Sequence, residues 1–391
     1  MLHLLLAPNA FKHSLDAHQV AEALRDGFLQ SRLECQISLF PVGDGGDGTC
    51  KLLHEKLGGK RITKTVSGPL GKPTHASYSL IDKGKTAVIE MADASGIWLI
   101  ETEDRAPLHT SSKGTGELIR DAVERHQVSH IILGMGGSAT VDGGCGMLHA
   151  LGVRFLDGKG HSLDPIPEQL RHIEEIDTSG LHKNVLDANI TILCDVKNYL
   201  LGENGAAYVF GPQKGASSAE VEVLDSFLSK LRNIVLKATG RDMASIVSGG
   251  TAGGAAAGMY ALLNAQLVNG ISYFLQKTGF ENTLTDINWL ITGEGSLDEQ
   301  TLEGKAPMGV ASLAKKYGIP VIGIAGSVPL QPSPKLLDYF DVLLPISHEA
   351  MSLGDAIVNT ELNLRRTGQA LGNILALQNG SFFSDRKIIE S

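Results

Sequence analysis

The sequence has few of the features that mark nucleic-acid-binding, membrane or disulfide-rich proteins. Acidic residues outnumber basic ones, for a formal net charge of −9, whereas binding to a nucleic-acid backbone needs a basic surface. Four cysteines are present without any CxxC spacing, at positions 35, 50, 145 and 194, which predicts neither a disulfide framework nor a zinc site. No apolar run reaches the roughly 18–20 residues of a membrane span.

The chain also lacks a recognisable signal peptide. Its start, MLHLLLAPNAF, has no basic region before the apolar run, and Pro8 ends that run early, so we interpret it as a first strand and expect a cytoplasmic protein. The 391 residues, 42% hydrophobic and 20% charged, indicate a globular protein of two or three domains. Aromatic residues are scarce at 5%, but there are 46 glycines outside low-complexity tracts, which favours many ligand-facing loops.

Residues 130–146, HIILGMGGSATVDGGCG, are the stretch around which the chain is organised. A short β-branched run predicts a buried strand, and the glycines after it predict a loop whose N–H groups can approach a ligand. A helix can begin after Gly146. A strand, a glycine loop and a helix N-terminus together predict an anion site. The phosphate-binding candidates are Gly136, Gly137, Ser138, Ala139 and Thr140.

Two other interpretations of this stretch stay open. Gly134, Gly136 and Ala139 fit the loose dinucleotide pattern G-x-G-x-x-A. The acidic residue that should follow is weak, because Asp157 lies in the turn-like FLDGKG. The stretch could also be a tight turn with close strand–helix packing.

Alternating strand and helix patterns at both chain ends predict an α/β fold. The pattern of predicted elements changes after Gly58. From there, residues 61–66, 74–81 and 85–91 indicate antiparallel strands joined by tight turns. We therefore predict two α/β domains around a cleft. One is Rossmann-like and discontinuous (residues 1–66 and 285–391), and the other (residues 67–284) is inserted into it.

A second site-like stretch is TGEGSLDEQTLEGKAP, residues 292–307. It follows a predicted strand and places three acids, Glu294, Asp298 and Glu303, near Lys305. It lacks the hydroxyl residue and glycine spacing of a Walker A loop. Carboxylates beside a lysine suit a metal–phosphate site; the alternative is a solvated charged loop.

Four more residues are candidates on the strength of their position. Asp44 and Asp47 lie between glycines after the second predicted strand, and are either turn formers or carboxylates directed into a cleft. Asp195 ends a strand and is a candidate base or metal ligand, or else forms an Asx turn. Lys12 lies in the first strand-end loop, where it either binds an anion or is a solvated surface group. In the same loop, Ser14 is expected to cap the helix that follows.

Nearly end to end, the chain resembles the bacterial glycerate kinase family. The stretches that carry the resemblance are APNAFKHSL, FPVGDGGDGT, GTGELI, GMGGSATVDGGCGML, CDV, VFGPQKGA, AGG and TGEGSLDEQTLEGKAP. The resemblance implies two α/β domains around a cleft, and transfer of the ATP γ-phosphate to D-glycerate with Mg²⁺, in many members at the 2-hydroxyl. Members commonly carry an acidic and a hydroxyl residue where this chain has Asn9 and Ala10, and many carry an aromatic residue at Lys113, so the substrate is less securely implied than the reaction.

Together, the residues and the resemblance predict conversion of D-glycerate to 2-phosphoglycerate by a monomer or homodimer that uses ATP and Mg²⁺. The assigned roles are catalysis (Asp195, Asp298, Lys12), phosphate binding (Lys305 with the five loop residues above), substrate binding (Lys12, Ser14, Asp44, Gly45, Gly46, Gln300, Thr301) and metal binding (Asp44, Glu294, Asp298). The alternatives are phosphorylation at the 3-hydroxyl or of another small hydroxy acid, a nicotinamide-dependent hydroxy-acid dehydrogenase, and a non-catalytic protein that binds small anions.

Overall fold

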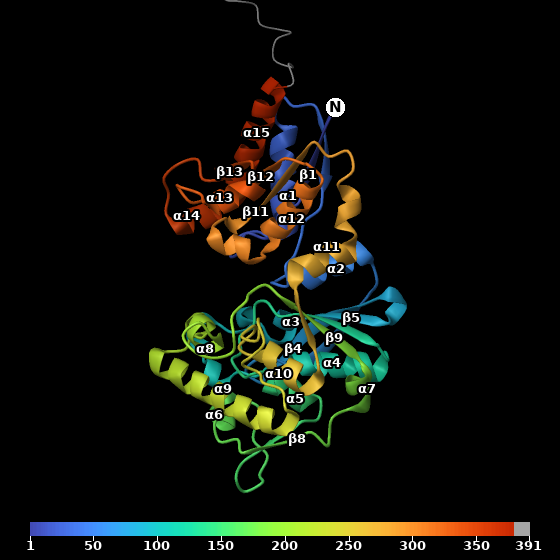
Figure 1. Cartoon of the computed structure of the whole chain (residues 1–391), viewed down its shortest axis with the longest axis vertical. Coiled ribbons are helices and arrows are strands. Elements are labelled where there is room, and N and C mark those ends of the chain that lie inside the picture. The colour runs from blue at the N-terminus through green and yellow to red at the C-terminus, as the bar shows by residue number, and fades with distance from the viewer. Residues whose placement is uncertain (379–391) are drawn as a thin grey trace, which may run out of the picture. The chain divides into compact units, whose positions relative to one another are not determined.

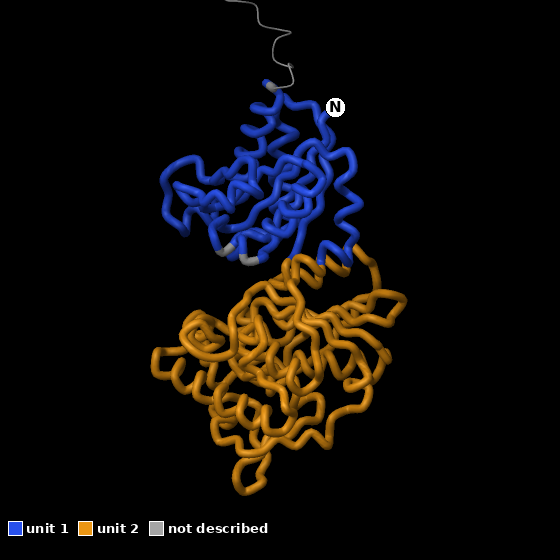
Figure 2. Tube along the Cα trace, viewed as in Figure 1, with its two compact units in different colours: residues 1–43, 274–391 blue, residues 44–273 orange. Residues whose placement is uncertain are grey.

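The computed structural model describes residues 1–378, apart from the side chains of Gln300, Glu303 and Gln378. The chain forms two compact units, shown in Figure 2. Unit 1 combines residues 1–43 with the described residues from 274 onward, and unit 2 comprises residues 44–273. Both units are α/β (Figure 1), as predicted.

Unit 1 is built on a parallel five-stranded sheet of order β13-β12-β11-β1-β2. Its strands are β1 (Leu2–Leu6), β2 (Cys35–Leu39), β11 (Trp289–Ser296), β12 (Val321–Ser327) and β13 (Val342–Pro345). Its helices are α1 (Ala17–Leu29), α12 (Ala306–Lys316), α13 (Pro334–Tyr339), α14 (Leu353–Val358) and α15 (Thr360–Gln378). Apolar residues of α1 and α15 share one core with the sheet, and Gly27 and Gly368 allow these two helices a close approach.

Unit 2 is built on a six-stranded sheet of order β10-β9-β6-β5-β4-β3. Its strands are β3 (Lys60–Ser67), β4 (Pro73–Ile81), β5 (Thr86–Glu90), β6 (His130–Gly134), β9 (Asn189–Cys194) and β10 (Gln266–Asn269), with a separate β7 (Arg154–Leu156) and β8 (Glu175–Asp177) pair. The run from β5 to β10 is parallel, and β3, β4 and β5 are antiparallel neighbours as predicted.

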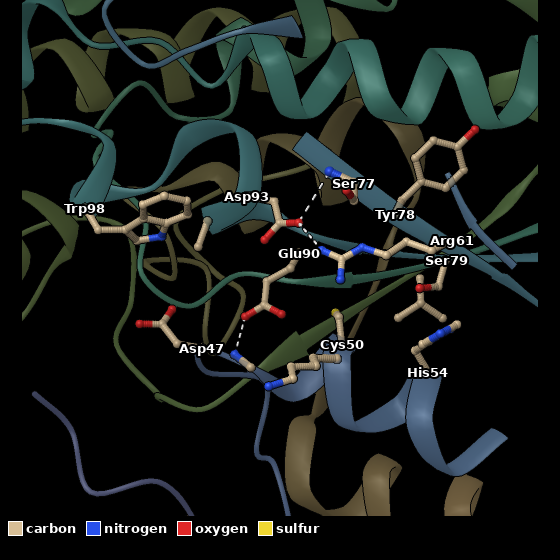
Figure 3. A pocket seen from close by; sticks show the side chains of 14 residues that line it. Asp47, Cys50, His54, Arg61, Ser77, Tyr78, Ser79, Glu90, Asp93 and Trp98 are labelled. Carbon is tan, nitrogen blue, oxygen red and sulfur yellow. Dashed lines mark hydrogen bonds and ion pairs between the residues drawn. The ribbon is translucent and has the colours of Figure 1, made fainter. Parts of the chain in front are cut away.

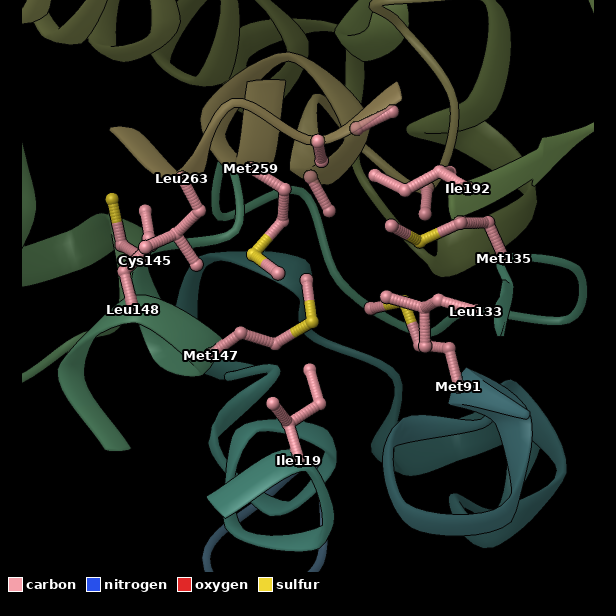
Figure 4. Packing of buried hydrophobic residues seen from close by; sticks show 14 of the residues in the cluster. Met91, Ile119, Leu133, Met135, Cys145, Met147, Leu148, Ile192, Met259 and Leu263 are labelled. Carbon is pink, nitrogen blue, oxygen red and sulfur yellow. The ribbon is translucent and has the colours of Figure 1, made fainter. Parts of the chain in front are cut away.

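The helices of unit 2 pack around this sheet. They are α2 (Thr49–Leu57), α3 (Met91–Ser95), α4 (Lys113–Arg125), α5 (Cys145–Ala150), α6 (Pro167–Leu170), α7 (Lys183–Asp187), α8 (Ala206–Phe210), α9 (Ser218–Thr239) and α10 (Ala255–Leu263); α11 (Gly270–Thr278) contains the chain boundary with unit 1. Figure 4 shows the buried side chains of Met135, near the start of the predicted phosphate loop, and Met147, directly after it, within the core beside Leu133, Ile119 and Met259. The ends of that loop are therefore held by apolar packing.

The boundaries of the two units differ from the predicted domain boundaries at 66/67 and 284/285. Residues 60–66 fall in the predicted discontinuous domain, but they form most of β3, which pairs with β4 in the larger sheet. Residues 44–57 also lie in unit 2. The predicted domain boundaries themselves stay a prediction.

Three local predictions were wrong. Asp16, not Ser14, caps α1: its carboxylate accepts the N–H of Gln19, whose side chain accepts the N–H of Asp16. The glycines at positions 293 and 295 predict a loop at a strand end, but residues 292–296 continue β11. The sequence VFGPQKG (residues 209–215) predicts an irregular loop, but the stretch contains the end of α8 and a 3-10 turn, Pro212–Lys214.

Within residues 1–378, no helix is both long enough and apolar enough to cross a membrane.

Candidate active site

The glycine-rich loop (residues 134–146) leaves the carboxyl end of β6 and leads into α5. Gly137 has a φ of +64°, and a Cβ built on it would lie 2.1 Å from a carboxylate oxygen of Asp47. A Cβ on Gly136 would lie 2.5 Å from the Cα of Gly46. Glycine is required at both positions because a second loop passes directly against this one.

Asp142 holds the glycine-rich loop in shape from inside. Its buried carboxylate accepts the backbone N–H groups of Ser112, Gly144 and Gly146, at 2.8, 3.0 and 3.1 Å, and also the Ser112 hydroxyl. Burial raises the pKa of Asp142, and these hydrogen bonds oppose the rise. The residue has a structural role, because its oxygens are occupied by the loop and by the start of α4.

Lys214 is the residue of this site that sequence reasoning missed. It is buried, and its Nζ donates to the Ser138 hydroxyl at 2.9 Å and to the Thr140 carbonyl oxygen at 2.8 Å. Burial lowers the pKa of Lys214 to about 7, and the charge of Asp142 opposes that shift. A buried lysine beside a glycine-rich loop supplies countercharge for an anion held by that loop.

The Thr140 hydroxyl is also buried, and within the described part of the chain its oxygen has no hydrogen-bond partner. Buried polar atoms without a partner are uncommon and call for an explanation. Together with the glycine backbone and Lys214, this hydroxyl makes the loop fit a phosphate group.

The second loop (residues 44–48) crosses the carboxyl ends of the unit 2 strands. The N–H of Gly136 donates to the carbonyl oxygen of Gly45 at 3.2 Å. A Cβ built on Gly46 would lie 3.1 Å from Asp44 Oδ1 and 3.6 Å from Asp195 Oδ2. The structure thus brings together two carboxylates that the sequence separates by about 150 positions, at the edge where α/β folds place their sites.

Glu90 anchors the far end of this second loop, and it too was missed. It ends β5, and its buried carboxylate accepts the N–H of Gly48, directly before α2. Burial raises the pKa of Glu90 to about 8, with the Gly48 hydrogen bond opposing the rise. Its position as an acidic residue at the end of a predicted strand was the signal that could have identified it.

In unit 1, most of the predicted site residues of the acidic segment (residues 292–307) lie close to one another. Glu294 lies on β11, 8% exposed; its Oε1 accepts the Thr301 hydroxyl at 3.4 Å and lies 3.7 Å from Lys305 Nζ. Asp298 accepts the hydroxyl of Ser296 at 3.0 Å. The short Glu299–Glu303 turn carries Thr301. The side chain of Gln300 lies outside the described residues.

The first strand-end loop lies beside β11 in the same unit. The N–H of Asn9 donates to the carbonyl oxygen of Gly293 at 2.9 Å, and Lys12 is exposed near Gly295. Ser14 donates its hydroxyl to the carbonyl oxygen of Ile357 at 2.8 Å. Lys12 therefore lies near β11, the strand of Glu294, whereas the Ser14 hydroxyl is occupied by the backbone of α14.

The predicted site residues form two sets, one at the carboxyl edge of each sheet. Unit 2 holds Asp44, Gly45, Gly46, Asp195 and the glycine-rich loop, and unit 1 holds Lys12, Ser14, Glu294, Asp298, Thr301 and Lys305. Among the residues that the structure describes, no cluster of three or more His, Cys, Asp or Glu side chains could hold a metal ion. The metal ligands Asp44, Glu294 and Asp298 stay a prediction.

Comparison with known proteins identifies the family of the chain. The model of the glycerate kinase family matches residues 4–376. The chain is 39% identical to a glycerate kinase of Bacillus subtilis over 97% of its length and all of that protein, and 43% identical to a glycerate 2-kinase of Escherichia coli over 84% and 86% of the two chains. A crystal structure from Salmonella typhimurium LT2, assigned as glycerate kinase 2, superposes with a TM-score of 0.79 at 38% identity and covers 97% of this chain and 99% of that one. The chain belongs to the glycerate kinase family.

Proposed function

We propose that the protein phosphorylates D-glycerate at its 2-hydroxyl, converting ATP to ADP and yielding 2-phosphoglycerate. The observation that carries the proposal is the buried Lys214 ammonium, held against Ser138 and Thr140 of the glycine-rich loop. A dehydrogenase does not need a buried cation at this place. The E. coli relative is a glycerate 2-kinase, which supports the same choice.

The glycine-rich loop would bind the donor phosphates. Gly136 and Gly137 present backbone without a Cβ, and Ser138 and Thr140 follow with hydroxyl groups. The N–H groups of Gly136 and Ala139 already donate to the carbonyl oxygens of Gly45 and Ser95, so these hydrogen bonds shape the loop. Lys214 offsets phosphate charge from the buried side of the loop. Phosphoryl transfer depends mainly on this kind of positioning and electrostatic stabilisation.

The acceptor hydroxyl needs a group that orients it and receives its proton. Its oxygen attacks the γ-phosphorus, the bond to the oxygen bridging the β- and γ-phosphorus breaks, and ADP leaves. Asp195 is placed for this role beside Asp44 and Gly46, and Asp298 is the second candidate. A carboxylate within hydrogen-bond reach of the hydroxyl would receive the proton.

The predicted substrate contacts are Lys12, Ser14, Asp44, Gly45, Gly46, Gln300 and Thr301. Lys12 and Lys305 would offset the charge of the glycerate carboxylate and of the transferring phosphoryl group. Ser14 is the weakest member, because its hydroxyl already donates to Ile357. Asn9 and Ala10 are the first positions to examine if another hydroxy acid is preferred.

The residues present fit Mg²⁺ in chemical type. Asp44 and Asp195 have oxygens within 4 Å of one point beside Gly46, and carboxylate oxygens are the ligands that Mg²⁺ takes. Glu294 and Asp298 are the other candidates. When bound, Mg²⁺ offsets the negative charge of the phosphate oxygens.

We also propose that the protein acts in the cytoplasm as a monomer or homodimer.

The test is ADP release by the purified chain with ATP, Mg²⁺ and a panel of small hydroxy acids. The proposal predicts turnover with D-glycerate that exceeds turnover with L-glycerate, lactate and glycerol. Turnover that is highest with another acceptor would reject the substrate. NAD-dependent oxidation of D-glycerate without ADP release would reject the kinase reaction itself.

A further inference from the structure

A cavity of about 290 Å³ lies in unit 2 next to the loop of residues 44–48 (Figure 3). Side chains of α2, β3, β4, β5 and α3 line it, and Trp98 lies at one end of the row of lining side chains in Figure 3, with His54 at the other. We propose that this cavity binds the base of the nucleotide donor, with Trp98 stacking on the base and Glu90 and Asp93 hydrogen-bonding to its polar edge. This inference rests on the proposed kinase function, and it goes beyond it by locating the nucleoside.

The cavity is connected to the proposed phosphate loop by backbone hydrogen bonds. The N–H of Ile97 donates to the carbonyl oxygen of Gly137 at 2.8 Å, and the N–H of Ala139 donates to that of Ser95 at 2.9 Å. Gly96 also forms a β-bridge with Ser138. The segment that carries Trp98 therefore runs along the phosphate loop, so a base in the cavity lies next to the place where its phosphates would bind.

Asp47 provides a second connection between the two places. Its side chain lines the cavity, and its carboxylate lies against Gly137. The volume is also informative, because pockets for complete drug-sized ligands measure about 300–1,000 Å³. At about 290 Å³ the cavity lies just below that range, which suits the base alone, with the phosphates outside it on the glycine-rich loop.

Trp98 has the properties of a stacking platform. It is one of two tryptophans in a chain poor in aromatic residues, and it is 61% exposed. A large aromatic ring left exposed at a cavity is a common feature of binding sites. Stacking on a nucleobase needs only a flat face, and it contributes substantially to nucleotide binding.

The acids of the cavity provide polar recognition. Burial raises the pKa of Glu90 to about 8, so near neutral pH its carboxyl group is largely neutral and offers a donor beside an acceptor. Adenine presents the matching pair, an amino group beside a ring nitrogen. Asp93, whose carboxylate accepts the N–H of Ser77 at 3.4 Å and lies 4.0 Å from Arg61, adds an acceptor for an amino group.

The experiment follows tryptophan fluorescence while adenosine, and separately ATP, is added to the full chain. The proposal predicts a saturable change in the wild type that persists in Trp289→Phe and disappears in Trp98→Phe. Trp289 is the matched control because it is the only other tryptophan and lies on β11 in unit 1. A wild-type signal that persists in Trp98→Phe, or no signal at ATP concentrations that saturate turnover, would overturn the proposal.

Kinetics give a second, independent test. In Trp98→Ala we expect the KM for ATP to rise about tenfold with kcat within about twofold of wild type, and Trp98→Phe should recover most of the affinity. Leu186→Ala, an exposed apolar position on α7 in the same unit, should leave both constants unchanged. An unchanged KM in Trp98→Ala would reject the cavity while leaving the kinase function intact. If fluorescence shows that nucleotide binds but the chain releases no ADP, the kinase function would be rejected instead.

Discussion

The Lys214 ammonium lies 2.9 Å from the Ser138 hydroxyl oxygen and is buried with it under the glycine-rich loop. The two residues are 76 positions apart in the chain. Because burial lowers the pKa of Lys214 to about 7, its amine is only partly protonated near neutral pH, and an anion above the loop would favour the charged form. The pair thus connects the 3-10 turn after α8 to the proposed phosphate site.

Replacing Lys214 with methionine should reduce activity more than stability. The variant keeps the volume but loses the charge and two hydrogen bonds, so we expect kcat/KM to fall at least tenfold, about 1.4 kcal/mol in transition-state free energy. The free energy of unfolding should change by less than about 2 kcal/mol, because removing a buried charge offsets the lost hydrogen bonds. ADP release and urea unfolding measure the two effects. Lys237→Met, exposed on α9, is the control, and equal activity of the two variants would count against the role of Lys214.

Asp195→Asn should abolish turnover and keep the fold. The amide matches the carboxylate in shape but cannot take the proton of the acceptor hydroxyl, and general-base catalysis contributes about 10²–10⁴-fold. We expect kcat to fall more than a hundredfold, with an unchanged circular dichroism spectrum. Asp187→Asn, exposed at the end of α7, is the matched control. A wild-type kcat in Asp195→Asn would transfer the base role to Asp298.

Glu90 should make the stability of unit 2 depend on pH. Its pKa rises from 4.5 to about 8 on folding. Between these values the unfolded chain has an ionised Glu90 and the folded chain a neutral one, so the free energy of unfolding falls as pH rises through this window. The slope from this residue is at most about 1.4 kcal/mol per pH unit.

Urea unfolding from pH 5 to pH 8 tests this prediction. Glu90→Gln should flatten the decline, because the amide stays neutral and can still accept the N–H of Gly48. Glu203→Gln, at an exposed position of the same unit, should leave the profile as in the wild type. Parallel wild-type and Glu90→Gln profiles would show that Glu90 is ionised in the folded protein.

Asp142 should matter for stability more than any other acid of the site. Its carboxylate accepts three backbone N–H groups, so Asp142→Ala leaves buried donors without partners at about 1–3 kcal/mol each. With three donors affected, we expect a loss of at least about 3 kcal/mol in the free energy of unfolding. Thermal unfolding with and without ATP is the measurement, and a loss below about 1 kcal/mol would contradict the anchoring role.

Much of the fold could be predicted because local patterns determine it. The β-branched run at Ile131 forms β6, and the alternating stretches before it form the antiparallel β3, β4 and β5. Asp44 and Asp195 were identified because each follows a strand, where α/β folds place their sites. Their proximity could not be predicted in this way, because the strands before them, β2 and β9, belong to different sheets.

The missed residues depend on partners that are distant in sequence. Lys214 follows a short helix in a stretch that looked irregular, and only its contact with Ser138 distinguishes it from a surface lysine. Glu90 meets Gly48 across 42 positions. The domain boundary near residue 67 was predicted from a local change in the pattern of strands and helices. The division into units depends instead on which sheet β3 joins, and β3 pairs with β4 in unit 2.

The most direct test of the central claim is the position of the phosphate in the product. The chain is incubated with ATP, Mg²⁺ and D-glycerate, and the phosphorus–proton coupling of the product is read by NMR. Phosphorylation at the 2-hydroxyl predicts coupling of phosphorus to one methine proton. Coupling to the two methylene protons would place the phosphate on the 3-hydroxyl and contradict the proposed reaction.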